Sequence, residues 1–423
     1  MSSGLMGARR LGAAGCLVGA LALGVGACGG DDSGGSSSSG GGNSASKELT
    51  IYSSMPLQGA SSAQSESIVN GEKLALAQER GRIGRFKISY SSLDDTTPAV
   101  QTADPGQTSA NARKASQDPA TIAYLGEGEG GASAISIPIL NEAGIVEVSP
   151  ADSVAGLTRQ EGADQGEPQK YYPSGKRTFV RVVPANHVQA AALAALMLDK
   201  GCTQTFLIRP STVFGRDLAS QLHLATKTDG PTIVRDQRLP PGAKDFRGVA
   251  EKVRTSGTDC MLFSGLTADG AAELFEQVHA AAPRVKLFGS SGVAESSFTT
   301  ALSPAVQRVT YVTSPGDPHL FPPAGKTFYA TYREKFGEEP EAAAIFGYEA
   351  MKLTLLAIQN AGDQGNDRRA VSDAIFKIKD HDSPLGRYSI DANGDTTLDS
   401  YAAETVRNGR LTFDRTLRTG SDE

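Results

Sequence analysis

A run of glycines and glutamates is the segment of the sequence that most resembles a chemical motif. Gly126 to Gly131 fits the pattern G-x-G-x-x-G between a predicted strand and a predicted helix, where a nucleotide-binding loop would stand. Glu127 and Glu129 would face the pyrophosphate, and two like charges about 4 Å apart repel by roughly 4 kcal/mol at an effective dielectric near 20. The same glycines suit a loop where a small ligand meets bare backbone amides. We therefore predict a ligand-binding loop and no cofactor.

The rest of the sequence contains no set of residues typical of catalysis or of metal binding. Asp391 to Asp395 begins like a calcium loop, but Ala402 stands where the closing glutamate is needed, so a hairpin turn is predicted. The G-x-S-x-G motif of many hydrolases does not occur. The histidines form no H-x-x-x-H pair on a helix and predict no zinc site; they are His187, His223, His279, His319 and His381. These features predict a binding protein and not an enzyme.

The N-terminus has the pattern of an export signal. Arg9 and Arg10 precede an apolar stretch that ends in Val25-Gly26-Ala27-Cys28, which resembles the bacterial lipobox. Residues 1–27 are predicted to be a cleaved signal peptide, and Cys28 is predicted to carry lipid. Residues 28–46, rich in Gly and Ser, are predicted to be a flexible tether. The predicted location is outside the cytoplasm, at the cell membrane and held there by the lipid anchor.

Composition narrows the possible partners. Loss of Arg9 and Arg10 with the signal peptide lowers the formal charge from -6 to -8. The remaining basic residues are dispersed, so no nucleic-acid partner is predicted. No second apolar segment reaches membrane length, so the chain is not itself a permease.

Two cysteines remain in the predicted mature chain beyond the lipidation site. Cys202 and Cys260 each stand just before a predicted strand, and an oxidising compartment favours their pairing. A single disulfide is therefore predicted.

From Lys47 onward, short β-rich runs alternate with helical patterns, which is typical of parallel sheets wrapped by crossover helices. One such α/β unit ends near Ser149, and a second starts at Phe179 after a polar insertion. Helices then span Gly325 to Lys379, and a strand-rich stretch follows. Two doubly wound α/β domains are predicted, with a ligand cleft between the carboxyl ends of their strands.

Several short motifs follow one another along the chain: Pro56-Leu57-Gln58-Gly59, Asn70-Gly71, Asn141 to Ile145 running into Val148 to Ala151, Phe214-Gly215-Arg216, Asp245-Phe246, Ser264-Gly265 and Gly347 to Ala350. In this order they resemble the leucine/isoleucine/valine-binding family of type I periplasmic binding proteins. The resemblance covers nearly all of Lys47 to Leu411. It implies three interdomain crossings, with a first domain of residues 47–180 and 313–384, a second of 181–312 and 385–415, and a tail of 416–423.

The resemblance also implies a binding site. In the family, the first domain holds a ligand carboxylate with helix-start amides and hydroxyls, and the second domain closes with aromatic rings and an acid. The matching positions that remain usable here are Gly130, Ala151, Ser153 and Phe214.

Three matching positions depart from the family pattern. Leu266 and Gln64 replace aromatic rings, and Ser291 stands where the family has the acid that holds a ligand ammonium. We therefore expect leucine, isoleucine and valine to bind weakly or not at all. Amides, modified amino acids and small polar aromatics are better candidates.

The leading interpretation is a solute-binding lipoprotein that serves an ABC-type permease. Two alternatives stay open from the sequence. One is a sensory ligand-binding protein of the same fold, which would need a signalling partner in the membrane. The other is an exported enzyme on a doubly wound scaffold, since a fold alone does not establish a function.

Overall fold

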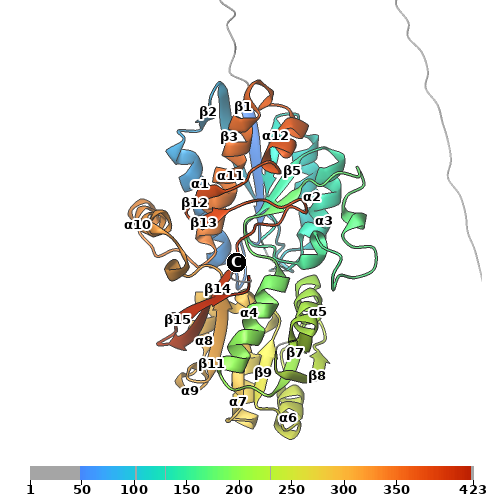
Figure 1. The fold of residues 1–423 in the computed structure, drawn as a ribbon, viewed down its shortest axis with the longest axis vertical. Coiled ribbons are helices and arrows are strands. Elements are labelled where there is room, and N and C mark those ends of the chain that lie inside the picture. The colour runs from blue at the N-terminus through green and yellow to red at the C-terminus, as the bar shows by residue number, and fades with distance from the viewer. Residues whose placement is uncertain (1–47, 101, 129, 229, 421–423) are drawn as a thin grey trace, which may run out of the picture. The chain divides into compact units, whose positions relative to one another are not determined.

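The computed structural model describes residues 48–420 except 101, 129 and 229. The predicted signal peptide, tether and lipidation site at Cys28 lie outside the described residues, as does Glu129. The described chain forms two α/β lobes, each built around its own sheet (Figure 1). The predicted fold class, two doubly wound α/β domains, is confirmed.

The first lobe contains a six-stranded sheet in the order β2-β3-β1-β4-β5-β6. Its strands are β1 (Glu48–Met55), β2 (Arg82–Ile83), β3 (Phe86–Asp94), β4 (Thr121–Leu125), β5 (Val146–Ser149) and β6 (Phe179–Arg181). All neighbours pair in parallel except β2 with β3. Every residue of β4 and β5 is buried, as expected for parallel strands covered on both faces.

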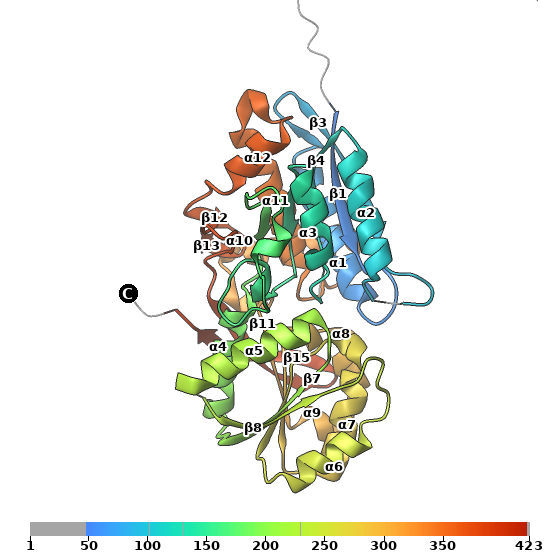
Figure 2. The same ribbon diagram turned by 90° about the vertical axis from the view of Figure 1, so that its right-hand side faces the viewer.

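Helices cover both faces of the first sheet (Figure 2). They are α1 (Ser62–Gln78), α2 (Pro105–Gln117), α3 (Ser133–Glu142), α10 (Pro323–Phe336), α11 (Ala344–Asn360) and α12 (Arg368–Ile375). Helices α1 and α11 lie side by side although they are far apart in the sequence. A side chain at Gly71 would place its Cβ 2.3 Å from the carbonyl oxygen of Ala344, and one at Gly347 would lie 2.3 Å from that of Ile68. Glycine at both positions therefore allows the close crossing of these helices.

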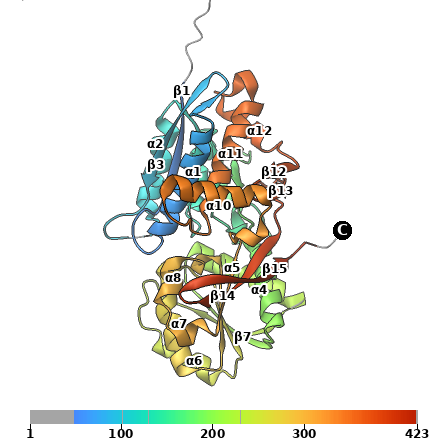
Figure 3. The same cartoon turned by 90° about the vertical axis from the view of Figure 1, so that its left-hand side faces the viewer.

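The second lobe contains a seven-stranded sheet in the order β15-β14-β11-β10-β9-β7-β8. Its strands are β7 (Gln204–Arg209), β8 (Thr232–Arg238), β9 (Cys260–Phe263), β10 (Lys286–Gly289), β11 (Thr310–Ser314), β14 (Ser400–Arg407) and β15 (Arg410–Arg418), and its helices are α4 (Asn186–Asp199), α5 (Val213–Thr228), α6 (Arg247–Thr255), α7 (Ala271–Ala281), α8 (Ser296–Ala301) and α9 (Pro304–Gln307). The first five strands are parallel, and the late strands β14 and β15 add an antiparallel edge that lies next to the first lobe in Figure 3.

The C-terminal part of the chain returns to the second lobe at a later residue than predicted from the sequence. The short hairpin of β12 (His381–Ser383) and β13 (Gly386–Tyr388) precedes the crossing. Leu385, Tyr388 and Ile390 pack in the core of the first sheet. The second domain was predicted to resume at residue 385. That boundary is too early, because these three side chains still belong to the core of the first lobe. Strand β15 also extends to Arg418, into the predicted tail.

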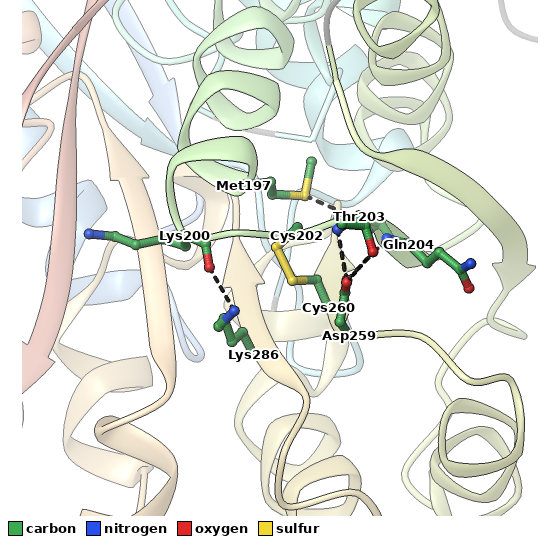
Figure 4. Close-up of a disulfide and its surroundings, with 9 residues drawn as sticks. Met197, Lys200, Cys202, Thr203, Gln204, Asp259, Cys260 and Lys286 are labelled. Carbon is green, nitrogen blue, oxygen red and sulfur yellow. Dashed lines mark hydrogen bonds between the residues drawn. A yellow bond between two sulfur atoms is a disulfide. The ribbon is translucent and has the colours of Figure 1, made fainter.

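A disulfide joins Cys202 to Cys260 at the amino-terminal end of the second sheet (Figure 4). Both cysteines are buried, and Cys260 pairs with Thr205 where β9 runs beside β7. Next to the bridge, the carboxylate of Asp259 accepts hydrogen bonds from the backbone amide and hydroxyl of Thr203. The bridge and these bonds fasten the two chain segments where their strands begin.

Within residues 48–420, leaving aside the undescribed positions, no helix combines the length and the apolar composition needed to span a membrane.

Candidate functional site

The carboxyl ends of the parallel strands of both sheets point toward the boundary between the lobes. In each sheet the chain first adds a strand on one side and then on the other, which creates a switch point between β1 and β4 in the first lobe and between β7 and β9 in the second. Loops at such points form the ligand sites of doubly wound folds. Each predicted site residue lies in a loop or helix start that follows one of these strands.

A cavity between the lobes brings together three of the predicted residues. Gln64 and Ala151 line it from the first lobe, and Ser291 lines it from the second. The remaining wall includes Pro150, Val183, Ala294, Ser314, Pro315, Gly316, Ala342, Ala343 and Phe346. Its free space is only about 30 Å³, roughly the share of one water molecule in the liquid. A larger solute therefore needs the lobes to move apart.

The predicted residues Gly130, Phe214 and Leu266 lie in an apolar contact between the lobes. A Cβ atom built on Gly130 would lie 3.6 Å from Cδ1 of Leu266. At the next residue, Gly131, such an atom would lie 2.6 Å from Val213, so only glycine permits this approach. Phe214 is buried in the adjoining apolar cluster. In this closed arrangement these residues contact protein atoms of the opposite lobe.

Ser153 is part of a hydrogen-bond chain that joins the lobes. Its hydroxyl donates to the side-chain oxygen of Asn186 over 2.8 Å, and the amide of Asn186 donates to Asp217 over 2.7 Å. Asp217 also accepts from the backbone amides of Ala155 and Gly156. Burial raises the pKa of Asp217 to about 6, although these donors favour its charged form. Sequence analysis did not single out Asn186 or Asp217, because neither residue type is unusual in the first turns of a helix.

Ser291 and Gln64 reach the cavity from opposite lobes. Ser291 begins the short helix η4 (Ser291–Val293), and its hydroxyl accepts a hydrogen bond from the amide of Gln189 on α4. Gln64 lies in the buried first turn of α1. The cavity therefore presents an amide and a hydroxyl where the family pattern has a ring and an acid.

Glu127, inside the glycine loop, is turned away from the cleft. The side chain is fully buried in the first lobe, and its Oε1 accepts from the hydroxyl of Tyr124 over 3.0 Å. Burial raises the pKa of Glu127 well above its ordinary value, and the nearby charge of Asp95 raises it further. The physical reason is that the polar interior formed by Tyr124 and Ser133 offers hydrogen bonds to this residue.

The predicted turn at Asp391 to Asp395 is confirmed, and it has a role that the sequence did not reveal. The carboxylate of Asp391 accepts from the backbone amides of Asn393 and Asp395, which closes the turn. Asp395 then pairs with Arg181 at the end of β6 and with Arg159. The turn therefore ties the last crossing segment to the first one.

The chain is similar to a known protein family and to several known proteins. The model of the periplasmic binding protein family matches residues 50–410. The Leu/Ile/Val-binding protein BraC3 of Rhizobium johnstonii is 22% identical over 373 residues, which cover 87% of this chain and 94% of that protein. An amino acid binding protein of Pseudomonas aeruginosa is 24% identical over 351 residues, or 82% of this chain and 87% of its own length.

Solved structures show the same fold. A leucine-binding protein LivK of Thermotoga maritima superposes with a TM-score of 0.75 at 21% identity, covering 88% of this chain and 99% of that one. A solute-binding protein of an ABC transporter from R. palustris, solved in complex with benzoate, gives a TM-score of 0.74 at 17% identity, covering 89% and 98%. Together with the two facing sheets, these matches show that the chain belongs to the leucine/isoleucine/valine-binding family of type I periplasmic binding proteins.

Proposed function

We propose that this protein is an extracytoplasmic solute-binding lipoprotein that captures a small polar solute and delivers it to an ABC importer. The observation that carries the proposal is the cavity between the carboxyl ends of two doubly wound sheets, lined by Gln64, Ala151 and Ser291. A thermal-shift screen against small solutes tests it, because a ligand that binds only the native state raises its stability with the logarithm of ligand concentration. Absence of any stabilising solute in a broad screen would contradict the proposal.

The proposed solute is an amide, a modified amino acid or a small polar aromatic molecule. Gln64 and Ser291 can exchange hydrogen bonds with such groups, and neither carries a charge to match a zwitterion. Phe214 offers an apolar face once the lobes separate. The R. palustris protein solved with benzoate shows that this fold accommodates a small aromatic ligand.

Leucine is expected to bind this protein weakly or not at all. The position that matches the family's acid is Ser291, so the ligand ammonium lacks that partner at this point of the cavity. For whichever solute the screen identifies, Phe214→Ala and Ser153→Ala are expected to weaken binding about tenfold, since each removes a contact at the closing boundary between the lobes. Isothermal titration calorimetry measures both effects.

Val234→Ala serves as the control, because Val234 is 42% exposed on β8, in the second lobe. It should leave solute affinity unchanged. Micromolar or tighter binding of leucine to the wild type would overturn the expected specificity.

Membrane attachment through a lipid on Cys28 can be tested separately. Cys28→Ala is expected to release the protein from the membrane fraction, because the acyl chains that would hold it attach to that sulfur. Cys16→Ala, which removes a cysteine inside the predicted signal peptide, should leave the protein membrane-bound. Immunoblots of membrane and soluble fractions measure the distribution, and retention of the Cys28 variant in the membrane would exclude this anchor.

A further inference from the structure

A second, larger groove adjoins the small cavity between the lobes. It has about 600 Å³ of free space and shares Ala294, Ser314, Gly316 and Ala342 with the cavity. Residues of both lobes line it: the loop before α8, the crossing after β11, helix α10, and the strands β14 and β15, which Figure 3 shows beside each other. A solute long enough to extend beyond the cavity would enter this groove.

One wall of the groove joins the lobes through two acids. Glu295 of the second lobe is 2% exposed, and its Oε1 accepts from the hydroxyl of Ser61 in the first lobe over 3.2 Å. Glu341 of the first lobe accepts from the backbone amide of Ser296 over 3.2 Å, and also from its hydroxyl. These contacts hold both carboxylates at the groove without a basic partner, since neither forms an ion pair with a described residue.

The facing wall carries another pair of acids. Glu404 on β14 is 4% exposed, and its carboxyl group contacts that of Asp317, the residue that caps the short helix η5 (Pro318–Leu320). Asp317 accepts from the backbone amide of His319 over 2.8 Å and from its ring nitrogen Nδ1 over 2.7 Å. The Oε2 atom of Glu404 has no hydrogen-bond partner among the described residues. A buried acceptor left without a donor is unfavourable, so this carboxyl group favours a ligand that brings one.

The basic side chains of the groove lie at its exposed rim. Arg333 pairs with Glu339 over 3.1 Å, while Lys326 and Arg410 form no ion pair with a described carboxylate. All three are exposed, in contrast to Glu295, Asp317 and Glu404. The interior of the groove is therefore acidic and its entrance is basic. The acidic interior is the part of the groove that favours an ammonium group.

We propose that the acidic interior formed by Glu295, Asp317, Glu341 and Glu404 binds an organic ammonium group, so that the solute of this protein carries an amine. An ammonium offers three N–H donors and a positive charge, which match the unpartnered oxygen of Glu404 and the paired carboxyl groups. The inference rests on the proposed solute-binding function. The amine would bind in the groove and not at Ser291, the position where the family has its ammonium-binding acid.

Binding of an amine is expected to strengthen as pH rises. Burial raises the pKa of Glu295 to about 7, and the charge of Glu341 opposes its ionisation further. Burial, the charge of Asp317 and a hydrogen bond to that residue raise the pKa of Glu404 well above its ordinary value. Besides these acids, the groups near Glu404 are Ser314, Tyr329, whose pKa is also raised by burial, and His319, whose ring nitrogen Nδ1 lies 2.7 Å from Oδ1 of Asp317. An ammonium therefore displaces protons from the groove, and it does so most readily at the higher pH.

The test uses calorimetry on the full-length mature protein with 1,4-diaminobutane as the probe and 1,4-butanediol as its neutral counterpart. We expect the diamine to bind at least about tenfold more tightly than the diol at pH 8, to lose affinity at pH 5.5, and to release protons in buffers of different ionisation enthalpy. Glu404→Gln should weaken diamine binding about tenfold and reduce the proton release. Glu334→Gln, an exposed acid on α10 outside the groove, should change neither.

The possible failures are distinguishable. If neutral amides stabilise the wild type but the diamine binds no better than the diol, the ammonium site is wrong and the proposed solute-binding function stands. If Glu404→Gln binds the diamine as tightly as the wild type does, the site is also wrong. If no solute of any class binds, both proposals fail.

Discussion

Replacing Cys202 and Cys260 together by alanine is expected to lower the free energy of unfolding by about 4 kcal/mol, the largest effect we expect from a loss of cross-linking. The bridge joins residues 58 positions apart, and in the chain-entropy model a loop of that length restricts the unfolded chain strongly. Both side chains are buried, so alanine also leaves unfilled space. Urea unfolding followed by circular dichroism measures the change.

The wild type unfolded in the presence of a reductant should approach the stability of the double variant, because both lack the same covalent link. Asp259→Asn is a useful companion, since Asp259 accepts hydrogen bonds from Thr203 beside the bridge without forming part of it. It should cost about 1 kcal/mol. A double variant within about 1 kcal/mol of the wild type, or two free thiols in the intact mass of the oxidised protein, would contradict a stabilising disulfide.

Asp395→Ala is expected to lower the free energy of unfolding by about 3–5 kcal/mol, because it leaves a buried guanidinium without its counter-charge. Arg181 has no exposed side-chain surface, and its Nε donates to Oδ1 of Asp395 over 2.9 Å. Its other nitrogens donate to the carbonyls of Asp152 and Val154 and to the hydroxyl of Thr158. Those bonds fix the guanidinium in place, so it cannot turn to solvent when the carboxylate is removed.

The pH dependence of the free energy of unfolding follows from the ion pair of Arg181 and Asp395. Burial alone would raise the pKa of Asp395, but the positive charges of Arg181 and Arg159 outweigh it and hold the pKa below its ordinary value. The stability that this carboxylate contributes is therefore present above about pH 4 and is lost as pH falls through the lowered pKa. Asp395→Ala should flatten the acid limb of the stability curve.

Two further variants separate the ion pair from a general loss of charge. Asp382→Ala removes an exposed acid of β12 and should change stability by no more than about 0.5 kcal/mol. Arg181→Met combined with Asp395→Leu should recover part of the loss, since paired apolar replacements remove both buried charges at once. A single Asp395→Ala variant as stable as the wild type would show that Arg181 does not depend on this partner.

The elements that sequence reasoning located well are those with a clear local signal. Strand β4 is a short apolar run followed by glycines, and helix α7 has an apolar face at helical spacing, so both could be placed from periodicity. Helix α1 starts at Ser62, although an apolar pattern with helical spacing begins only at Ile68. Its first turns bury Gln64, Ser65 and Ser67, which lack the apolar spacing that marks a helix, because their neighbours are supplied by α10 and the second lobe.

Three of the predicted site residues come together in the structure, but the details of their surroundings could not be predicted. Gln64, Ala151 and Ser291 line one cavity because the carboxyl ends of parallel strands must meet at one edge of each sheet. Glu127 lies among the glycines of the predicted ligand loop but is buried in the first lobe, since the orientation of a side chain in a loop depends on the interior that the fold builds around it.

The sequence by itself determined the alternation of strands and helices, the pair of cysteines available for a disulfide, and the turn at Asp391 to Asp395, because each depends on spacing over a few residues or on a simple count. Only the tertiary structure decided which charged groups meet. Arg181 and Asp395 are 214 residues apart, and Ser61 and Glu295 are 234 residues apart. Such contacts follow from how the chain crosses between the lobes and from burial, which lowers the local dielectric and makes each unpaired carboxylate costly. No local pattern in the sequence carries that information.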